Sequence, residues 1–152
     1  KAAGAKVTVT SRDEKKRKAA MEMGADFAID SNCDWSQAVG GEKFDLIIDS
    51  IGSATFPRYL SVLRSGGRIV NFGATTGDQI HLSLRTFFYG QFTLMGTSMG
   101  SAEEFANMLK FVEKHRIRPV IDRTYPLSEA FQAFKRMEEG NQFGKICLII
   151  SV

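Results

Sequence analysis

The sequence predicts an α/β fold in which helices cover both faces of a doubly wound, mostly parallel sheet. Short apolar or β-branched segments alternate with amphipathic segments along the whole chain. One strand candidate, 44–49, is a nearly continuous apolar run, which is typical of a strand buried on both faces of a parallel sheet. The chain has 152 residues, 43% of them hydrophobic, which is enough to form one domain with a sizeable core.

The first half of the chain reads as repeated strand and helix units. A β-branched run opens the series, and the charged segment after it contains apolar positions and stops at Gly24. Pro57 falls in the first turn of the last helix in this half, where proline costs little. The predicted elements are strands at 6–10, 26–30 and 44–49, a helix at 11–23, a weakly helical stretch at 32–41, and a helix that starts at Ser53.

The second half continues the alternation after the Gly66-Gly67 turn. Ser101 and Glu104 have the spacing of a capping box, which predicts a helix start there and an end near His115. The predicted elements are strands at 68–72 and 92–97, a loop from 73 to about 91, a helix at 101–115, an extended segment at 119–121, a helix at 128–140 and a last strand at 145–150.

Ligands of doubly wound sheets bind outside the carboxyl ends of the strands, so residues just after each strand are candidates. At the end of the second strand of a dinucleotide-binding fold, a carboxylate suits the ribose of NAD and an Arg suits the 2′-phosphate of NADP. The corresponding strand here ends in Ser11-Arg12, with Lys16 one helical turn further on. A hydroxyl and a guanidinium at this position predict NADP binding. The alternative interpretation is that these residues are only the exposed start of a helix.

Charge and cysteine content exclude several other classes. The 20 Lys and Arg residues exceed the 17 Asp and Glu residues by only three, and the run Lys15–Lys18 scatters around a helix instead of forming a stripe. We therefore expect no nucleic-acid partner. No window is long and apolar enough to predict a membrane span. Cys33 and Cys147 are far apart in the sequence, which favours a reducing, cytoplasmic setting over a disulfide framework.

Several motifs together resemble the medium-chain dehydrogenase/reductase superfamily, which includes zinc-type alcohol dehydrogenases and quinone oxidoreductases. The resemblance covers essentially the whole chain and implies a Rossmann-like cofactor-binding portion. The motifs are Ala2-Ala3-Gly4-Ala5-Lys6-Val7, Glu22-Met23-Gly24-Ala25-Asp26, Phe44-Asp45-Leu46-Ile47-Ile48-Asp49-Ser50-Ile51-Gly52, Ser65-Gly66-Gly67-Arg68-Ile69-Val70, Gly96-Thr97-Ser98-Met99-Gly100 and Phe143-Gly144-Lys145-Ile146.

The resemblance also implies which residues contact the cofactor. It divides the chain into a partial dinucleotide-binding domain, 1–122, and a tail, 123–152, that packs with a catalytic domain in the family. It further implies a homodimer through the strand at 92–97. The implied contacts are Ser11, Arg12 and Lys16 with the adenosine phosphate, Ser50 and Ile51 with the adenine ribose, Phe72, Gly73 and Ala74 with the nicotinamide side, Thr97, Ser98 and Met99 with the carboxamide, and Lys145 with the pyrophosphate.

The chain departs from the family pattern at its start. No G-x-G-x-x-G motif occurs, and residues 1–4 read as the end of a helix, so we expect the first strand and the Gly-rich turn to be missing. The strands at 6–10 and 44–49 would then face a gap with unpaired backbone groups. We hypothesise that the strand at 145–150 fills it, or else a partner's strand or a separate peptide.

The resemblance favours an NADP-preferring oxidoreductase that acts on an alcohol, carbonyl or quinone. We assign no catalytic residue and no metal ligand to this chain, because His81, His115 and the two cysteines lack ligand spacing; zinc remains an option for the full-length enzyme. Without the Gly-rich turn, we expect weak cofactor binding and no turnover from the isolated chain. Two alternatives stay open, an adenosylmethionine-dependent methyltransferase-like domain and a non-catalytic dimerisation module.

Overall fold

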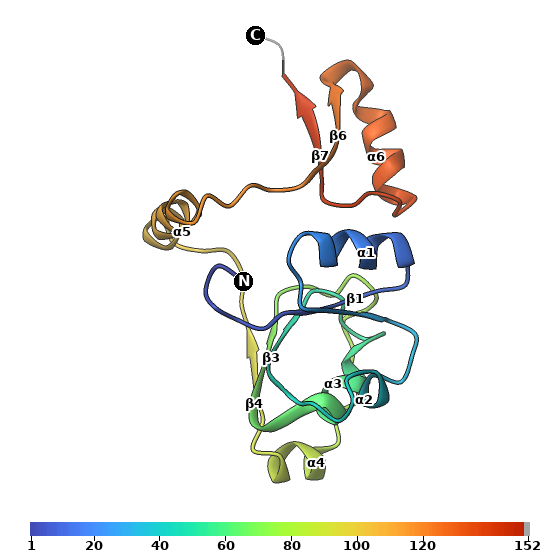
Figure 1. Cartoon of the computed structure of the whole chain (residues 1–152), viewed down its shortest axis with the longest axis vertical. Coiled ribbons are helices and arrows are strands. Elements are labelled where there is room, and N and C mark those ends of the chain that lie inside the picture. The colour runs from blue at the N-terminus through green and yellow to red at the C-terminus, as the bar shows by residue number, and fades with distance from the viewer. Residues whose placement is uncertain (151–152) are drawn as a thin grey trace. The chain divides into compact units, whose positions relative to one another are not determined.

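The computed structural model describes residues 1–150, which form two compact units. Unit 1 comprises residues 3–100 with Lys1, and unit 2 comprises Ala2 with the chain from Ser101 onward. All paired strands are parallel, which confirms the predicted α/β class (Figure 1). In order, the elements of unit 1 are β1 (Thr8–Ser11), α1 (Glu14–Glu22), β2 (Phe27–Asp30), α2 (Trp35–Ala38), β3 (Phe44–Asp49), α3 (Phe56–Val62), β4 (Leu63–Asn71), α4 (Leu84–Tyr89) and β5 (Thr93–Gly96).

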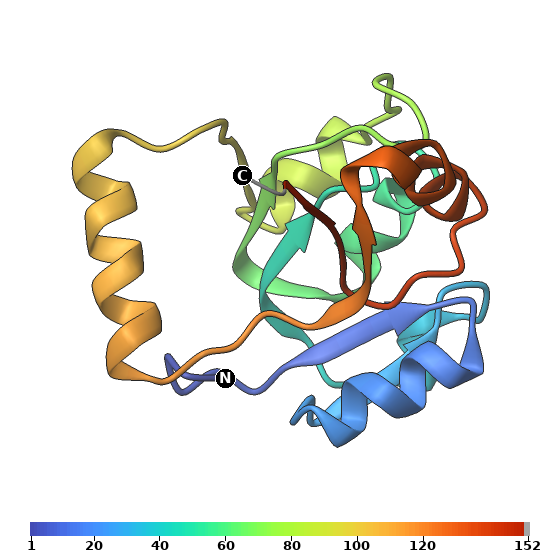
Figure 2. The same cartoon turned by 90° about the horizontal axis from the view of Figure 1, so that it is seen from above.

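The first strands of unit 1 form a small sheet with one helix. β1 pairs with β2 from Thr8 opposite Phe27 to Ser11 opposite Asp30, and α1 runs alongside the pair (Figure 2). α1 starts where it does because the Asp13 carboxylate accepts hydrogen bonds from the backbone N–H groups of Lys15 and Lys16. None of residues 1–34 is buried, so this region is held more by hydrogen bonds and ion pairs than by a core of its own.

A three-stranded sheet in the order β3-β4-β5 forms the second part of unit 1. Its register places Ile47, Ile69 and Leu94 side by side, and Ile48, Val70 and Met95 one step further along. Because successive side chains point to opposite faces, these two rows lie on different faces of the sheet. The first face carries α3 and the buried Ile69, whereas the second leaves Ile48 68% exposed. Within residues 1–100, helices therefore cover one face of this sheet better than the other.

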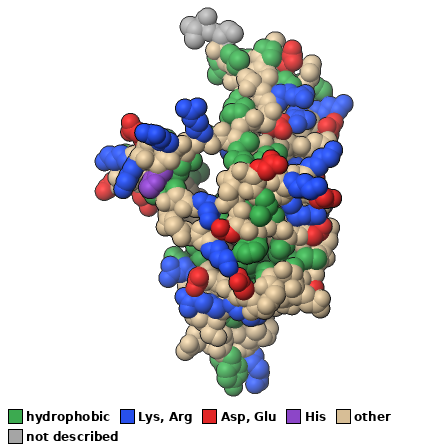
Figure 3. Space-filling view, viewed as in Figure 1, with side chains coloured by type: hydrophobic (Ala, Val, Ile, Leu, Met, Phe, Trp, Pro, Cys, Tyr) green, Lys and Arg blue, Asp and Glu red, His purple; other side chains and the backbone are tan. Residues whose placement is uncertain are grey.

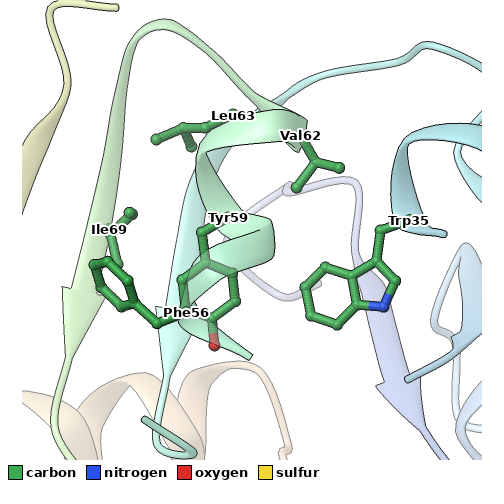
Figure 4. Close-up of a cluster of buried hydrophobic side chains, with 6 residues drawn as sticks. All are labelled: Trp35, Phe56, Tyr59, Val62, Leu63 and Ile69. Carbon is green, nitrogen blue, oxygen red and sulfur yellow. The ribbon is translucent and has the colours of Figure 1, made fainter. Parts of the chain in front are cut away.

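The core of unit 1 lies between α2, α3 and the β3-β4-β5 sheet (Figure 4). Tyr59 lies between Phe56 and Trp35, with ring centroids 5.4 and 5.9 Å apart. Val62 and Ile69 are fully buried, since helical spacing brings the apolar side of α3 onto β4. The buried cluster consists of Trp35, Phe56, Tyr59, Val62, Leu63 and Ile69.

The described strands form three sheets instead of one continuous sheet, and β1 and β3 belong to different sheets. This agrees with the predicted interruption between the strands at 6–10 and 44–49. The hypothesis that the strand at 145–150 fills the interruption is wrong, because β7 (Lys145–Ile149) pairs with β6 (Ile121–Pro126). A partner's strand or a separate peptide in that place remains a prediction.

Unit 2 contains the β6-β7 pair and two helices, α5 (Ala102–Lys114) and α6 (Ala130–Glu138), with a short 3-10 turn, η1 (Leu127–Glu129), before α6. Arg136 of α6 donates two hydrogen bonds, of 2.5 and 2.9 Å, to the Asp122 carboxylate, which also accepts one from the Phe143 N–H group. These bonds lower the pKa of Asp122 to about 2. They tie α6 and the start of β7 to β6.

Most predicted elements are confirmed within about three residues at each end, and three differ by more. α4 lies inside the predicted loop at 73–91, β4 begins at Leu63 instead of 68, and β6 covers Ile121–Pro126 where the extended segment was predicted at 119–121. The capping box of Ser101 and Glu104 is present at the start of α5. None of the helices in residues 1–150 is long and apolar enough to span a membrane.

Candidate functional site

The carboxyl ends of β3, β4 and β5 lie together at one edge of their sheet. Asp49, Asn71 and Gly96 are neighbours in the strand register. Just beyond them, the Phe72 N–H group donates to the Asp49 carbonyl at 2.9 Å, and the Thr97 N–H group donates to the Asn71 carbonyl at 3.0 Å. The segments that follow the three strands therefore start side by side. This is the edge at which sheets of this class bind ligands.

Two of these segments, 50–54 after β3 and 73–77 after β4, are joined by hydrogen bonds along their length. Thr75 donates to the Ser50 carbonyl through its hydroxyl at 3.0 Å, and Thr76 donates to the Ile51 carbonyl through both its N–H and its hydroxyl group, at 2.9 and 2.8 Å. The Ser53 hydroxyl donates to the Thr76 carbonyl at 2.9 Å. We call segments 50–54 and 73–77 the paired loops.

Asp49 lies beneath the paired loops and is 1% exposed. One of its carboxylate oxygens, Oδ1, accepts from Ile51 N at 2.8 Å, Gly52 N at 3.2 Å and the Tyr59 hydroxyl at 2.6 Å. The other, Oδ2, accepts from Asn71 Nδ2 at 2.8 Å. Burial alone would raise the pKa of Asp49, but these hydrogen bonds outweigh it and lower that pKa, so the side chain is a carboxylate. Burial and the bond to Asp49 raise the pKa of Tyr59.

Two glycines let the paired loops approach each other closely. Gly52 has a φ of +87°, and a Cβ there would lie 2.5 Å from the Gly77 carbonyl oxygen. A Cβ on Gly73 would lie 2.8 Å from the Ser50 carbonyl oxygen. Both distances are shorter than real Cβ atoms tolerate, so each position requires glycine for the backbones to pack as they do.

The end of β1 is open by comparison. Arg12 is exposed, and the Ser11 hydroxyl accepts a hydrogen bond from Asp13 N at 3.2 Å. Arg17 donates to the Ser11 carbonyl at 2.6 Å and to Asp30 at 3.0 Å, so this member of the basic run is an internal contact and not part of a solvated face. Figure 3 shows acidic side chains among the basic ones over α1, where Lys18 pairs with Glu14 at 2.9 Å.

The structure brings some of the predicted cofactor residues together and separates others. Ser50 and Ile51 lie against the loop that begins with Gly73 and Ala74, and Thr97 starts beside the end of β4. Met99 has a φ of +20° and is 99% exposed. The remaining predicted residues stand at the end of β1 and in α1 (Ser11, Arg12 and Lys16), after β4 (Phe72), after β5 (Ser98), and in unit 2 at the start of β7 (Lys145).

The residues that could bind a metal are dispersed in the structure. Cys33 donates to the Asp30 carbonyl at 3.1 Å, and His115 packs on the Phe111 ring at 4.3 Å between centroids. Cys147 lies in β7 of the other unit, and both cysteines are free. Among residues 1–150, no three His, Cys, Asp or Glu side chains are grouped to hold a metal ion. The described residues therefore do not fit a zinc site.

The geometry agrees with what comparisons with known proteins find. A sequence profile described as zinc-binding dehydrogenase matches residues 1–114. The chain belongs to this family. Membership confirms the predicted place in the medium-chain dehydrogenase/reductase superfamily, and unit 1 has the Rossmann-like fold of the cofactor-binding domain of its structural relatives.

Individual relatives differ in the cofactor that their names state. The zinc-type alcohol dehydrogenase-like protein YogA of Leptosphaeria maculans is 31% identical over 98% of this chain and 45% of its own length. NADP-dependent alcohol dehydrogenase 6 of Saccharomyces cerevisiae is 34% identical over 93% of this chain and 40% of its own length. The crystal structure of an NAD-dependent alcohol dehydrogenase matches with a TM-score of 0.86 at 31% identity, over 97% of this chain and 45% of that one. The chain thus spans less than half of each relative.

Sequence reasoning placed Asp49 at the end of the strand at 44–49 but did not assign it, Tyr59 or Asn71 a role in the site. Their contacts join residues 10 and 22 positions apart, which no local motif records. The available signal was the Asp49 carboxylate itself, because an Asp at the end of a nearly continuous apolar strand has to find hydrogen-bond donors or remain in water.

Proposed function

We propose that unit 1 binds the nicotinamide nucleotide of an oxidoreductase that prefers NADP over NAD. The observation that carries the preference is the end of β1, where the exposed Arg12 follows Ser11 and no carboxylate stands at residue 11. A guanidinium forms paired, charge-assisted hydrogen bonds with phosphate oxygens, whereas a carboxylate in this place would bond the free hydroxyls of NAD and repel a phosphate.

Asp13, the carboxylate nearest to Arg12 in the sequence, does not contradict this assignment. Its Oδ1 atom faces the first turn of α1, where it accepts from Lys15 N at 2.7 Å and from Lys16 N at 3.4 Å. Its charge is thus directed toward the positive end of the helix. Arg12 and the side chain of Lys16 supply positive charge for a 2′-phosphate, and the Ser11 hydroxyl can donate to one of its oxygens.

The paired loops fit the flat part of the nucleotide. Gly73 and Ala74 present backbone with little side chain, and Ile51 is 39% exposed beside them, which suits van der Waals contact with a ring or a ribose. When bound, the nicotinamide accepts or donates a hydride. The N–H groups of Ile51 and Gly52 are already donated to Asp49, so this loop supplies orientation more than phosphate binding.

We further infer the setting of the full-length protein from the family. It acts on an alcohol, carbonyl or quinone, with any zinc held by residues outside 1–150, and the isolated chain has no turnover. Lys145 contacts the pyrophosphate, and residues 123–152 pack with a catalytic domain. β5 supports a homodimer, because it is an edge strand whose four residues are all exposed. The free cysteines suit a cytoplasmic setting.

Titration of the chain with NADPH and NADH, followed by nucleotide fluorescence, tests the preference. We expect tighter binding of NADPH, and an Arg12→Ala variant should lose about tenfold in NADPH affinity while its NADH affinity stays unchanged. Lys18→Ala is the matched control, because Lys18 is also basic and on α1 but is paired with Glu14. Equal affinities for the two nucleotides in the unmodified chain, or equal losses in both variants, would contradict the assignment.

A further inference from the structure

We propose that Asp49 and Asn71 are positioning residues that set how the paired loops are presented to the nicotinamide nucleotide. The inference rests on the proposed function for its ligand, but not for its geometry. The two side chains touch no predicted phosphate ligand. They act through the backbone of the segments that follow β3 and β4.

Asn71 joins the two loops from below. Its Nδ2 atom donates to Asp49 Oδ2 at 2.8 Å and to the Gly73 carbonyl at 2.8 Å. Asp49 in turn accepts from the N–H groups of Ile51 and Gly52. One chain of hydrogen bonds therefore runs from Ile51 through Asp49 and Asn71 to Gly73. It fixes the residues that are predicted to flank the ribose on one side and the nicotinamide on the other.

We call the chain of hydrogen bonds from Ile51 to Gly73 the bridge. Tyr59 belongs to the same network but not to the bridge. Its hydroxyl donates to Asp49 Oδ1 and lies 2.7 Å from the Thr55 hydroxyl, on the α3 side of the carboxylate. It contacts neither loop through a hydrogen bond that would link the two. Tyr59 therefore offers a control, because removing its hydroxyl takes one donor from the same carboxylate and leaves the connection between the loops intact.

Amide hydrogen exchange in the ligand-free chain tests the geometry. In Asn71→Leu, the amides of Thr75 and Thr76, which lie on loop 73–77, should exchange about tenfold faster relative to core amides of β3. The reason is that the hydrogen bond from Asn71 to the Gly73 carbonyl, which holds this loop, is lost. In Tyr59→Phe the same ratio should change less than twofold. Asp49→Asn replaces one carboxylate oxygen by an NH2 group, and with the remaining oxygen facing Ile51 N, Gly52 N and the Tyr59 hydroxyl, Asn71 loses its acceptor. The double variant Asp49→Asn/Asn71→Leu should therefore be no worse than the more affected single variant.

Nucleotide titration then connects the bridge to function. NADPH affinity should fall about tenfold in Asn71→Leu and less than twofold in Tyr59→Phe, even where the two variants lose similar stability to urea. Equally faster exchange at Thr75 and Thr76 in Asn71→Leu and in Tyr59→Phe would overturn the positioning role. An unmodified chain that binds no NADPH would overturn the proposed function, and the exchange comparison would still decide the role of the bridge.

Discussion

In unit 1, the strand ends of the β1-β2 pair and of the β3-β4-β5 sheet have different surroundings. β3 ends at Asp49, a buried carboxylate held by neutral donors, beneath two loops that are bonded together. β1 ends at Ser11 and the exposed Arg12, in a region without a buried residue. The first arrangement fixes backbone, and the second leaves a charged side chain accessible to a ligand. We infer that the site divides its work in the same way, with orientation at β3 and β4 and charge recognition at β1.

The largest expected effect comes from removing the buried carboxylate. Asp49→Ala leaves the Tyr59 hydroxyl, Asn71 Nδ2 and two backbone N–H groups without their acceptor, which should lower the free energy of unfolding by about 3 kcal/mol or more. Urea denaturation followed by the fluorescence of Trp35, the single tryptophan, measures it.

Asp45→Ala is the control for that change, since Asp45 lies on the same strand with an exposed side chain that pairs with Arg64. We expect a loss below about 0.5 kcal/mol there. If the free energy of unfolding fell equally in Asp49→Ala and Asp45→Ala, the buried network would contribute no more to stability than a surface ion pair, which would contradict this prediction.

A smaller effect is expected from adding a methyl group to one glycine in a turn of each region. Gly52→Ala places a Cβ 2.5 Å from the Gly77 carbonyl oxygen at a φ of +87°, whereas Gly24→Ala, at +101° between α1 and β2, meets nothing within 4 Å. We expect the free energy of unfolding to fall by about 2 kcal/mol in Gly52→Ala and by about 1 kcal/mol in Gly24→Ala, the second from backbone conformation alone. The same urea experiment measures both, and equal losses would show that the paired loops separate to accommodate a methyl group.

The smallest effect is a difference in salt response between two aspartates. The pKa of Asp26 lies below its ordinary value because Lys1 and the Val7 N–H group donate to it, and that of Asp49 is lowered by neutral donors. For both, the stabilisation is present above the unfolded pKa and is lost as pH falls through the lowered folded value.

In carboxyl NMR titrations, raising the salt to about 1 M shortens the Debye length to roughly 3 Å and weakens exposed ion pairs such as Lys1–Asp26. The pKa of Asp26 should therefore move upward and that of Asp49 should stay in place. An equal shift at both positions would mean that the Asp49 network depends on a cation that the contacts do not include.

Local signals in the sequence were sufficient for most elements. The capping box at Ser101 marks the start of α5, and the apolar run 44–49 coincides with β3. α4 was missed, although Ser83 caps it and Gly90 ends it, because its six residues are too few to show a helical period. Short capping signals inside a long predicted loop were the available indication.

The site was less accessible from sequence because its contacts are long-range. Positions after strands predicted where Ser50, Gly73 and Thr97 would lie, since parallel strands end at one edge. Nothing local indicated that Asn71 would bridge Asp49 to Gly73, or that Arg17 would turn inward to Ser11 and Asp30. Those contacts follow from strand register and from the packing of α1, which only the folded chain defines.

The cap of α1 has an evolutionary consequence. Asp13, and neither of the two residues before it, satisfies the first N–H groups of the helix. Substitution at Arg12 thus leaves the cap intact, and substitution at Ser11 removes only one side-chain hydrogen bond, to the Asp13 N–H group. With Ser11 and Arg12 as the proposed nucleotide contacts, selection for a different nucleotide would act on these two positions with little penalty to folding, so related chains could diverge in cofactor while their fold stays the same.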